Sequence, residues 1–171
     1  FKNVSRHGSK PGTKAIPLES GTVFVQRQGK SLNEFLFSDQ QLTYITSKVS
    51  LLSGHLLKSP KRMALRRATS TDEGDLLLIS NEEDGSLAVF SIMRSQNVVA
   101  PSQYETNGEF LDVNCDVQDI YVATKRTFNS TNKFFIEEFN DNSFTDCSFM
   151  ASAATASITG LPHTAETVNV I

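Results

Sequence analysis

Three histidines and two cysteines are the side chains best suited to catalysis or metal binding in this chain of 171 residues. Arg6-His7-Gly8 is the most suggestive group, because a histidine nucleophile beside a phosphate-holding arginine suits phosphoryl transfer. His163 would supply a distant second histidine. The triplet, however, lies in a loop rich in Gly, Ser and Lys, without the flanking strand and helix that such chemistry requires. We therefore predict that His7 is not catalytic.

The other nucleophilic side chains also lack supporting partners. Ser53 and His55 pair a hydroxyl with an imidazole, but adjacency in sequence does not orient a triad. Cys115 belongs to an apolar–polar alternation over 111–117 that points it into a core, and no nearby base or cation lowers the pKa of its thiol. We expect Cys147 to be packed as well. We assign no catalytic, cofactor-binding or metal-binding residue, and we expect no cofactor and no enzyme activity.

Acidic and basic clusters are the remaining candidates for ligand binding. The acidic segments 72–75 and 82–84 would hold a cation only if their two turns met, and they do not follow the calcium-loop pattern. A basic run could contact phosphates, but it lacks the interleaved aromatic residues that stack on bases, so we predict a solvated strand edge. The run comprises Lys58, Lys61, Arg62, Arg66 and Arg67.

The net charge of −3 conceals an uneven distribution. Residues 1–67 contain 12 Lys and Arg against 3 Asp and Glu, whereas residues 68–171 contain 4 against 16. This polarity has two interpretations. It either builds a surface that meets a second copy head to tail, or strands from both halves interleave so that the charges mix in space.

The sequence predicts mainly β-strands as the elements that position these residues. Pairs of apolar stretches joined by short polar turns predict three β-hairpins. The middle turn contains Asp84-Gly85, the strongest short hairpin signal in the chain. The predicted strand pairs are 22–28 with 32–37, 75–80 with 86–93, and 119–126 with 133–139.

The first strands of the hairpins begin near residues 22, 75 and 119, at spacings of 53 and 44 residues. A period of about 40–50 residues is typical of a propeller-type array. The predicted fold class is all-β, with serial β-hairpins forming part of a β-propeller-like domain. Propellers close with roughly 4–8 blades, so three units do not complete a ring. The alternative is a plain meander or sandwich with similar hairpins. Apolar positions on the hairpins predict a core of Val23, Val25, Phe35, Phe37, Leu76, Leu78, Leu87, Val89, Ile120, Val122, Phe135 and Phe139.

Helix patterns are few. Asp39 is placed to cap a short turn over 40–47, and the leucines of 49–57 predict a short helix packed on the sheet. The small, uncharged residues after 148 indicate a boundary. We expect residues 1–148 to form the propeller-like domain, and residues 149–171 to form a linker and the first strand of a following β domain. We also expect the chain to be part of a longer polypeptide.

Six segments in order resemble the tail tubular protein B family, the nozzle proteins of short-tailed bacteriophages. Residues 21–30 (GTVFVQRQGK) resemble its "vlFvQRxGrk" segment, and residues 121–139 resemble its "vyvvvkRtingxxxryIErl" hairpin. The remaining similar segments are 32–38, 51–56, 84–87 and 158–168. Two departures are the absence of Trp and an alanine, Ala165, at a position where the family has Gly.

The resemblance implies a structural virion protein of the tail nozzle, the distal tail tube through which DNA leaves the particle. It implies a homo-oligomeric ring, a hexamer by family resemblance, that binds the tail adaptor and other tail proteins and assembles in the bacterial cytoplasm. Genomic DNA would pass through without sequence reading. Because phosphate contacts would retard a sliding duplex, we place the basic run at subunit contacts or on the outer surface, away from the channel. No apolar run has the length of a membrane span.

Two other classes of function compete with this interpretation. The runner-up is a carbohydrate- or receptor-binding β module of a phage tail, although the lack of Trp and the presence of only three Tyr argue mildly against sugar stacking. A hydrolase using His7 or His55 ranks last.

Overall fold

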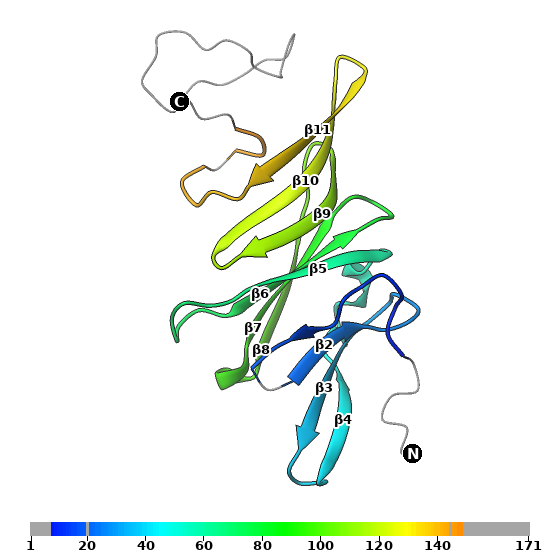
Figure 1. Ribbon diagram of the computed structural model, residues 1–171, viewed down its shortest axis with the longest axis vertical. Helices are drawn as coiled ribbons and strands as arrows, with labels where there is room; N and C mark the ends of the chain where they lie inside the picture. Colours follow the sequence, from blue (N-terminus) through cyan, green and yellow to red (C-terminus); the bar gives the residue numbers. More distant parts are fainter. Residues whose placement is uncertain (1–7, 20, 144, 149–171) are drawn as a thin grey trace.

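Three antiparallel sheets make up the computed structural model, which describes residues 8–19, 21–143 and 145–148 (Figure 1). Each sheet is a meander whose strands follow one another in chain order, and none is closed. The first sheet contains β1 (Ile16–Pro17), β2 (Gly21–Val25), β3 (Leu32–Ser38) and β4 (Thr43–Lys48). The middle sheet contains β5 (Pro60–Arg66), β6 (Asp75–Asn81), β7 (Leu87–Met93) and β8 (Val98–Tyr104). The third sheet contains β9 (Glu109–Asp116), β10 (Asp119–Phe128) and β11 (Thr131–Glu138).

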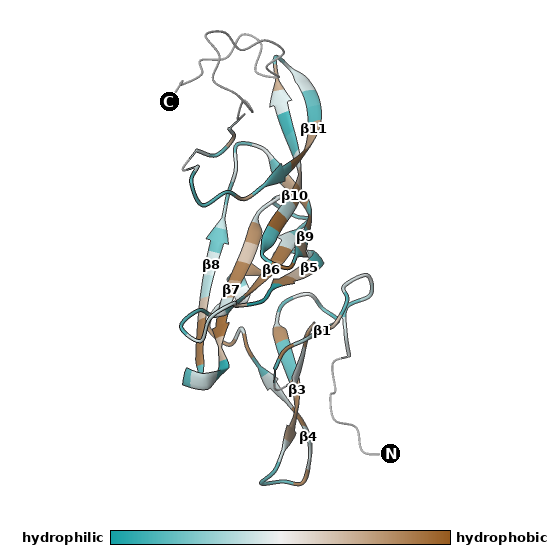
Figure 2. Ribbon diagram, turned by 60° about the vertical axis from the view of Figure 1, so that its left-hand side comes forward, coloured by the Kyte–Doolittle hydropathy of each residue, from teal (hydrophilic) through white to brown (hydrophobic). Residues whose placement is uncertain are grey.

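The two central strands of the middle sheet, β6 and β7, are buried on both faces. On β6, Leu77 and Ile79 pack toward the first sheet, whereas Leu76 and Leu78 pack toward the third. Successive side chains of a strand point to opposite faces, so the uninterrupted apolar run of β6 supplies both cores. Figure 2 shows this concentration of hydrophobic residues along β6 and β7.

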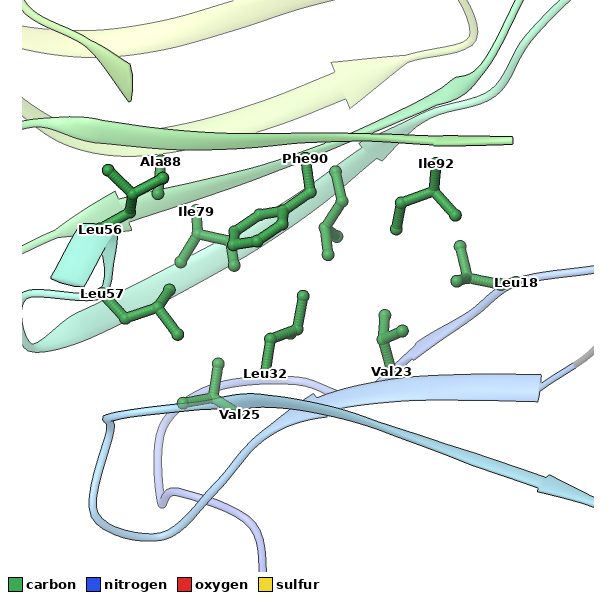
Figure 3. Close-up of a cluster of buried hydrophobic side chains, with 11 residues drawn as sticks. Leu18, Val23, Val25, Leu32, Leu56, Leu57, Ile79, Ala88, Phe90 and Ile92 are labelled. Carbon is green, nitrogen blue, oxygen red and sulfur yellow. The ribbon is translucent and has the colours of Figure 1, made fainter. Parts of the chain in front are cut away.

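The core between the first and middle sheets is drawn in Figure 3. Val23, Val25 and Leu32 of the first sheet meet Phe90 and Ile92 of β7, and all five side chains are buried. Leu56 and Leu57, at the end of the connection from β4 to β5, close one end of this core (Figure 3).

The core between the middle and third sheets is built from a different set of positions. Leu87 and Val89 of β7 pack against Val113 of β9 and against Ile120 and Val122 of β10. Val89 and Phe90 are neighbours on β7 yet belong to different cores. The chain therefore stacks its sheets in sequence order, with one hydrophobic layer between each pair.

The first strands of the three sheets lie next to one another. β1 contacts β5, and β5 contacts β9. The hairpins later in the first and third sheets reach opposite ends of the molecule, with β3–β4 at the bottom and β10–β11 at the top of Figure 1. The sheets therefore spread from a common edge formed by their first strands.

The turn at Asp84-Gly85 confirms the predicted hairpin β6–β7. Asp84 Oδ1 accepts hydrogen bonds from the backbone N–H and the hydroxyl of Ser86. Gly85 has φ +65°, and a Cβ added there would lie 2.6 Å from the Cβ of Glu109. The carbonyl of Gly85 also accepts the N–H of Phe110 at 2.7 Å. Glycine therefore permits both the turn and its close contact with β9.

The other two hairpins are also present, but the helix predictions are largely wrong. Residues 43–48, which overlap most of the expected turn over 40–47, form strand β4. The expected helix over 49–57 reduces to a single 3₁₀ turn at Gly54–Leu56, and Leu51 and Leu52 are exposed. β-branched and aromatic residues such as Thr43 and Tyr44 favour the pleated conformation beside β3, which outweighs the local helix signal. A second 3₁₀ turn spans Arg94–Gln96.

The predicted core is correct where two sheets meet and wrong on the outer faces. The buried positions are Val23, Val25, Leu78, Leu87, Val89, Ile120 and Val122. Leu76, Phe35 and Phe135 are half-buried, and Phe37 and Phe139 are exposed. The predicted segment 149–171 lies outside the described residues. Within the described residues, no helix is long and apolar enough to span a membrane.

Candidate functional site

Of the three histidine candidates, only His55 lies in the described part of the chain. Arg6, His7 and His163 lie outside the described residues. His55 is exposed on the 3₁₀ turn Gly54–Leu56, while the neighbouring Ser53 is buried. The imidazole and the hydroxyl thus occupy different environments, as expected for a histidine at the end of a short turn.

Both cysteines are reduced and partly buried. Cys115 packs against the core between the middle and third sheets, and burial raises the pKa of its thiol to about 11. Burial also raises the pKa of Cys147, whose Sγ lies 3.9 Å from Oε1 of Glu137. The contact of Cys115 with this core confirms its predicted packing. Thiols that stay protonated near neutral pH are poor nucleophiles.

The two acidic turns do not meet. Residues 72–75 lead into the first residue of β6 and residues 82–84 follow its last, so the length of that strand separates them. Asp75 instead accepts the N–H of Ala68 at 2.8 Å. In the part of the chain that the structure describes, no group of three or more His, Cys, Asp or Glu side chains is placed to hold a metal ion.

The basic run lies on β5, an edge strand of the middle sheet, and on the residues that flank it. Three of its five side chains face carboxylates from the acidic half of the sequence. The pairs are Lys58–Asp84 at 2.6 Å, Lys61–Glu82 at 3.7 Å and Arg62–Asp112 at 3.7 Å. In this region the interleaving interpretation of the uneven charge is therefore correct. Arg66 is half-buried, and Arg67 is exposed.

Arg126 on β10 is the centre of the most connected polar cluster. Its side chain is 3% exposed and forms a bidentate pair with Glu137 of β11, with both N–O distances 2.7 Å. Its remaining N–H groups donate to a carboxylate oxygen and the carbonyl of Asp146 and to the carbonyl of Asn107. All five guanidinium donors are thus used within the chain, so the cluster has none left for a bound anion.

Asp146 connects the segment after β11 to the turn before β9. Its carboxylate accepts hydrogen bonds from the hydroxyl of Thr106 at 2.6 Å and the N–H of Asn107 at 2.8 Å. Burial raises the pKa of this carboxyl, but these hydrogen bonds and Arg126 outweigh the burial, so its pKa lies below the usual value of 3.8. The cluster is therefore a structural clamp that holds the third sheet to the segment following it.

A groove of about 810 Å³ lies beside this clamp, between the end of β8 and the face of the third sheet. Aromatic side chains line one part of it, and Phe139 contacts both Tyr104, at 5.8 Å between ring centroids, and Phe110, at 6.3 Å. Glu105 and Glu137 contribute carboxylates to its wall. An aromatic surface beside carboxylates has the chemistry to bind a sugar ring.

A second ion pair joins the first and middle sheets. Glu34 of β3 is 2% exposed and pairs with Arg94 of the second 3₁₀ turn. Oε1 of Glu34 has no hydrogen-bond partner among the described residues. Burial raises the pKa of this carboxyl, and the nearby Arg94 charge offsets only part of the increase.

The outer faces of the stack carry exposed apolar side chains. On the first sheet, Phe35 stacks on Tyr44 at 5.0 Å and Phe37 meets Tyr44 edge-on at 5.3 Å, on the face opposite the core. On the third sheet, Phe134 and Ile136 are 67% and 83% exposed. They alternate with residues that face the middle sheet, so they point away from it.

Inspection of the residue pattern missed the Arg126 clamp and the outer faces. The clamp depends on the register of β10 with β11 and on a contact with Asp146, about 20 residues away. A usable signal was present, since a hairpin with an internal Arg on one strand and a Glu on the other permits a cross-strand ion pair.

Comparison with known proteins adds no family assignment. No protein-family model and no curated protein matches the chain.

Proposed function

We propose that the chain is a non-enzymatic structural protein of a short-tailed bacteriophage, part of the nozzle of the tail. Its three sheets act as blades of a propeller-like ring that other β segments complete. One observation carries the proposal: strands β6 and β7 of the middle sheet are buried on both faces by the first and third sheets, and each of those two sheets keeps apolar side chains exposed on its other face.

The order of the strands supports the blade-like interpretation. In a propeller, each blade is an antiparallel meander, and the blades pack face to face around a central axis. Here three meanders stack in chain order, and their first strands, β1, β5 and β9, are neighbours in succession. A sandwich of two sheets would leave no middle sheet covered on both sides.

The segments that resemble nozzle proteins hold structural positions, which also supports the proposal. Arg126 and Glu137, the charged residues matched in the last hairpin, form the bidentate pair across β10 and β11. Gly29 and Gly85, which also lie in matched segments, occupy turns with positive φ. Residues of this kind maintain a scaffold and perform no reaction.

Localisation on purified particles tests this function. An antibody raised against the chain should label the distal end of the tail in the phage whose genome encodes it. Disruption of the gene should leave particles with filled heads and shortened tails. Purified, infectious particles that lack the protein would overturn the proposal.

A second candidate function is carbohydrate binding, which the aromatic groove beside the Arg126 clamp favours. A glycan array distinguishes it, with Tyr104→Ala as the groove variant. If the wild-type chain binds a glycan on the array and the variant does not, the groove is a sugar site. If the wild-type chain binds no glycan, only the structural role remains of the two candidates.

A further inference from the structure

We infer that the chain binds the surface of an anionic lipid bilayer through the turn at residues 50–53, here called the leucine turn. The two central residues of this turn, Leu51 and Leu52, are exposed. The site also includes three neighbouring cations, which are Arg27, Lys30 and Lys48. The inference goes beyond the proposed function and does not depend on it.

The leucine turn is held in place by the residues at its two ends. The N–H of Ser53 donates to the carbonyl of Ser50 at 3.3 Å, and both serines are buried. The hydroxyl of Ser50 accepts the N–H of Leu32, the first residue of β3, at 2.8 Å. Leu51 and Leu52 therefore occupy the central positions, where they are 71% and 90% exposed. Small and polar residues usually fill such positions, so two adjacent leucines there indicate contact with a partner outside the chain.

Three exposed cations surround the leucine turn. Lys48 is the last residue of β4, two positions before the turn. Lys30 belongs to the connection between β2 and β3, and a Cβ added at Gly54 would lie 3.2 Å from the carbonyl oxygen of Lys30, so the two loops are in contact. Arg27 lies in the same connection. None of the three cations forms a salt bridge with a described residue, so their charges are free to act on a ligand.

The segments that form this end of the first sheet carry no opposing charge. Residues 26–31 and 48–57 contain no Asp or Glu. The acidic turn 82–84 lies further along the chain, where its carboxylates pair with Lys58 and Lys61. The surface around the leucine turn is therefore positive, which complements anionic head groups.

Two other turns expose an apolar residue but lack this positive charge. Leu42, which is 81% exposed, lies in the turn between β3 and β4 together with Asp39. Val117, which is 77% exposed, lies between Asp116 and Asp119 in the turn between β9 and β10. A carboxylate beside the apolar residue repels an anionic surface. Of these three turns, only the leucine turn combines the apolar and basic signals that together hold a protein on a membrane surface.

The two signals act at different depths of the bilayer. The leucine side chains enter the boundary between head groups and acyl chains, whereas the cations stay among the head groups. The backbone of the turn remains outside the hydrocarbon region, because unpaired N–H and C=O groups are costly there. Two leucines and three cations form a small site, so binding should be reversible, require anionic lipid and weaken as salt rises.

Tryptophan fluorescence tests the site directly, because the chain contains no Trp and an introduced one is the sole reporter. Leu52→Trp places the reporter in the leucine turn, and Leu42→Trp places it in the matched control turn. The probe is a vesicle of phosphatidylcholine with about one third phosphatidylglycerol. On its addition the emission of Leu52→Trp should shift to shorter wavelength, whereas that of Leu42→Trp should not. Vesicles of phosphatidylcholine alone should cause a much smaller shift.

Cosedimentation with the same vesicles measures the affinity of the 171-residue chain without a reporter. Replacement of both Leu51 and Leu52 by Gln should lower the partition coefficient at least about tenfold, whereas Leu42→Gln should leave it unchanged. Lys48→Glu should lower it at least about fivefold. Arg67→Glu, at an exposed arginine beyond the far end of β5, should have a clearly smaller effect. All the replaced side chains are exposed, so circular dichroism and thermal melting should match the wild type.

Several outcomes would overturn the inference. They are a wild-type chain that does not bind anionic vesicles, binding that survives replacement of both leucines, binding that is as strong without phosphatidylglycerol, and an equal loss in Leu42→Gln. If the leucines contact another protein instead, the wild-type chain stays in the supernatant with every vesicle, which also contradicts lipid binding. A chain that binds anionic vesicles but is absent from phage particles would support this inference and overturn the proposed function, so the two hypotheses fail separately.

Discussion

Phe90 and Phe35 lie in similar hairpins and have opposite environments. Phe90 of β7 is fully buried between the middle and first sheets. Phe35 of β3 is half-buried on the outer face of the first sheet, where it stacks on Tyr44. The residue type and the strand are similar, so the difference comes from the presence of a neighbouring sheet. The fold thus covers some sheet faces with a neighbouring sheet and leaves other sheet faces uncovered.

Strand composition reflects the same difference. β6 has consecutive Leu residues because both of its faces are covered, whereas β10 alternates buried Ile120 and Val122 with less buried Tyr121 and Ala123. In a strand with one covered face, apolar residues alternate with polar ones, whereas a strand with two covered faces has a continuous run of apolar residues. Strands β6 and β7 are therefore covered on both sides, whereas the outer faces of the first and third sheets keep apolar side chains exposed.

Phe90→Ala should be the most damaging substitution. Removal of a fully buried phenylalanine leaves a cavity, so we expect the free energy of unfolding to fall by about 3–5 kcal/mol. Urea denaturation followed by circular dichroism measures this change. Phe90→Leu, which keeps most of the apolar volume, should cost clearly less. A loss no greater than that for Phe35→Ala would contradict the contrast between the two layers.

The fold class and the three hairpins were predictable because turn chemistry and apolar periodicity are local signals. Asp84-Gly85 specifies its turn through glycine conformation and side-chain hydrogen bonds within four residues. β8 was not predicted, because it has five exposed positions and contains Pro101, and its strand form depends on pairing with β7. The stacking order of the sheets depends on contacts that no local pattern records.

Arg126→Ala should have the next largest effect. The substitution leaves the carboxylates of Glu137 and Asp146 without their guanidinium partner. Because both carboxylates are partly exposed, we expect the free energy of unfolding to fall by about 2–3 kcal/mol, which is less than for a wholly buried pair. Lys125→Ala, which breaks a more exposed pair with Glu109, should change stability by less than about 1 kcal/mol. Equal effects from the two substitutions would show that the clamp is not structural.

Hydrogen exchange would locate the effect of Arg126→Ala. The backbone N–H of Asn107 donates to Asp146, so its protection should fall with the clamp while that of β6 is retained. Uniform loss of protection would indicate general destabilisation instead.

One prediction about a candidate residue, the packing of Cys115 into a core, is confirmed. Cys115 was predictable from its alternating neighbours, because the same alternation that buries it raises the pKa of its thiol. The pairing of Lys58 with Asp84 was not predictable, because the two residues are 26 positions apart and meet only through the fold. Long-range ion pairs of this kind depend on how β6 and β7 bring their turn back to β5.

Phe35→Ala should lower the free energy of unfolding by about 1–2 kcal/mol. This is less than the loss expected if Phe35 were a core residue, as the sequence predicted. The side chain is half-buried and keeps one stacked ring partner, so less apolar area returns to water and no closed cavity forms. Urea denaturation at a concentration where the chain is monomeric measures this value. A loss of 3 kcal/mol or more would show that this outer face is packed as tightly as the interior.

Glu34→Gln should give the smallest effect and a distinctive pH dependence. The pKa of Glu34 is raised above its ordinary value of 4.5, so the folded state binds this proton more tightly than the unfolded state does. The contribution of Glu34 to stability is therefore fully present below pH 4.5 and is lost as the pH rises through the raised pKa. Glutamine stays neutral, so the stability of the variant relative to the wild type should increase across this interval and then level off.

The difference in unfolding free energy, measured at several pH values, isolates this group from other carboxylates such as Asp146. A variant that loses stability relative to the wild type as pH rises would mean that Arg94 holds Glu34 charged, and that this ion pair strengthens the contact between the first and middle sheets.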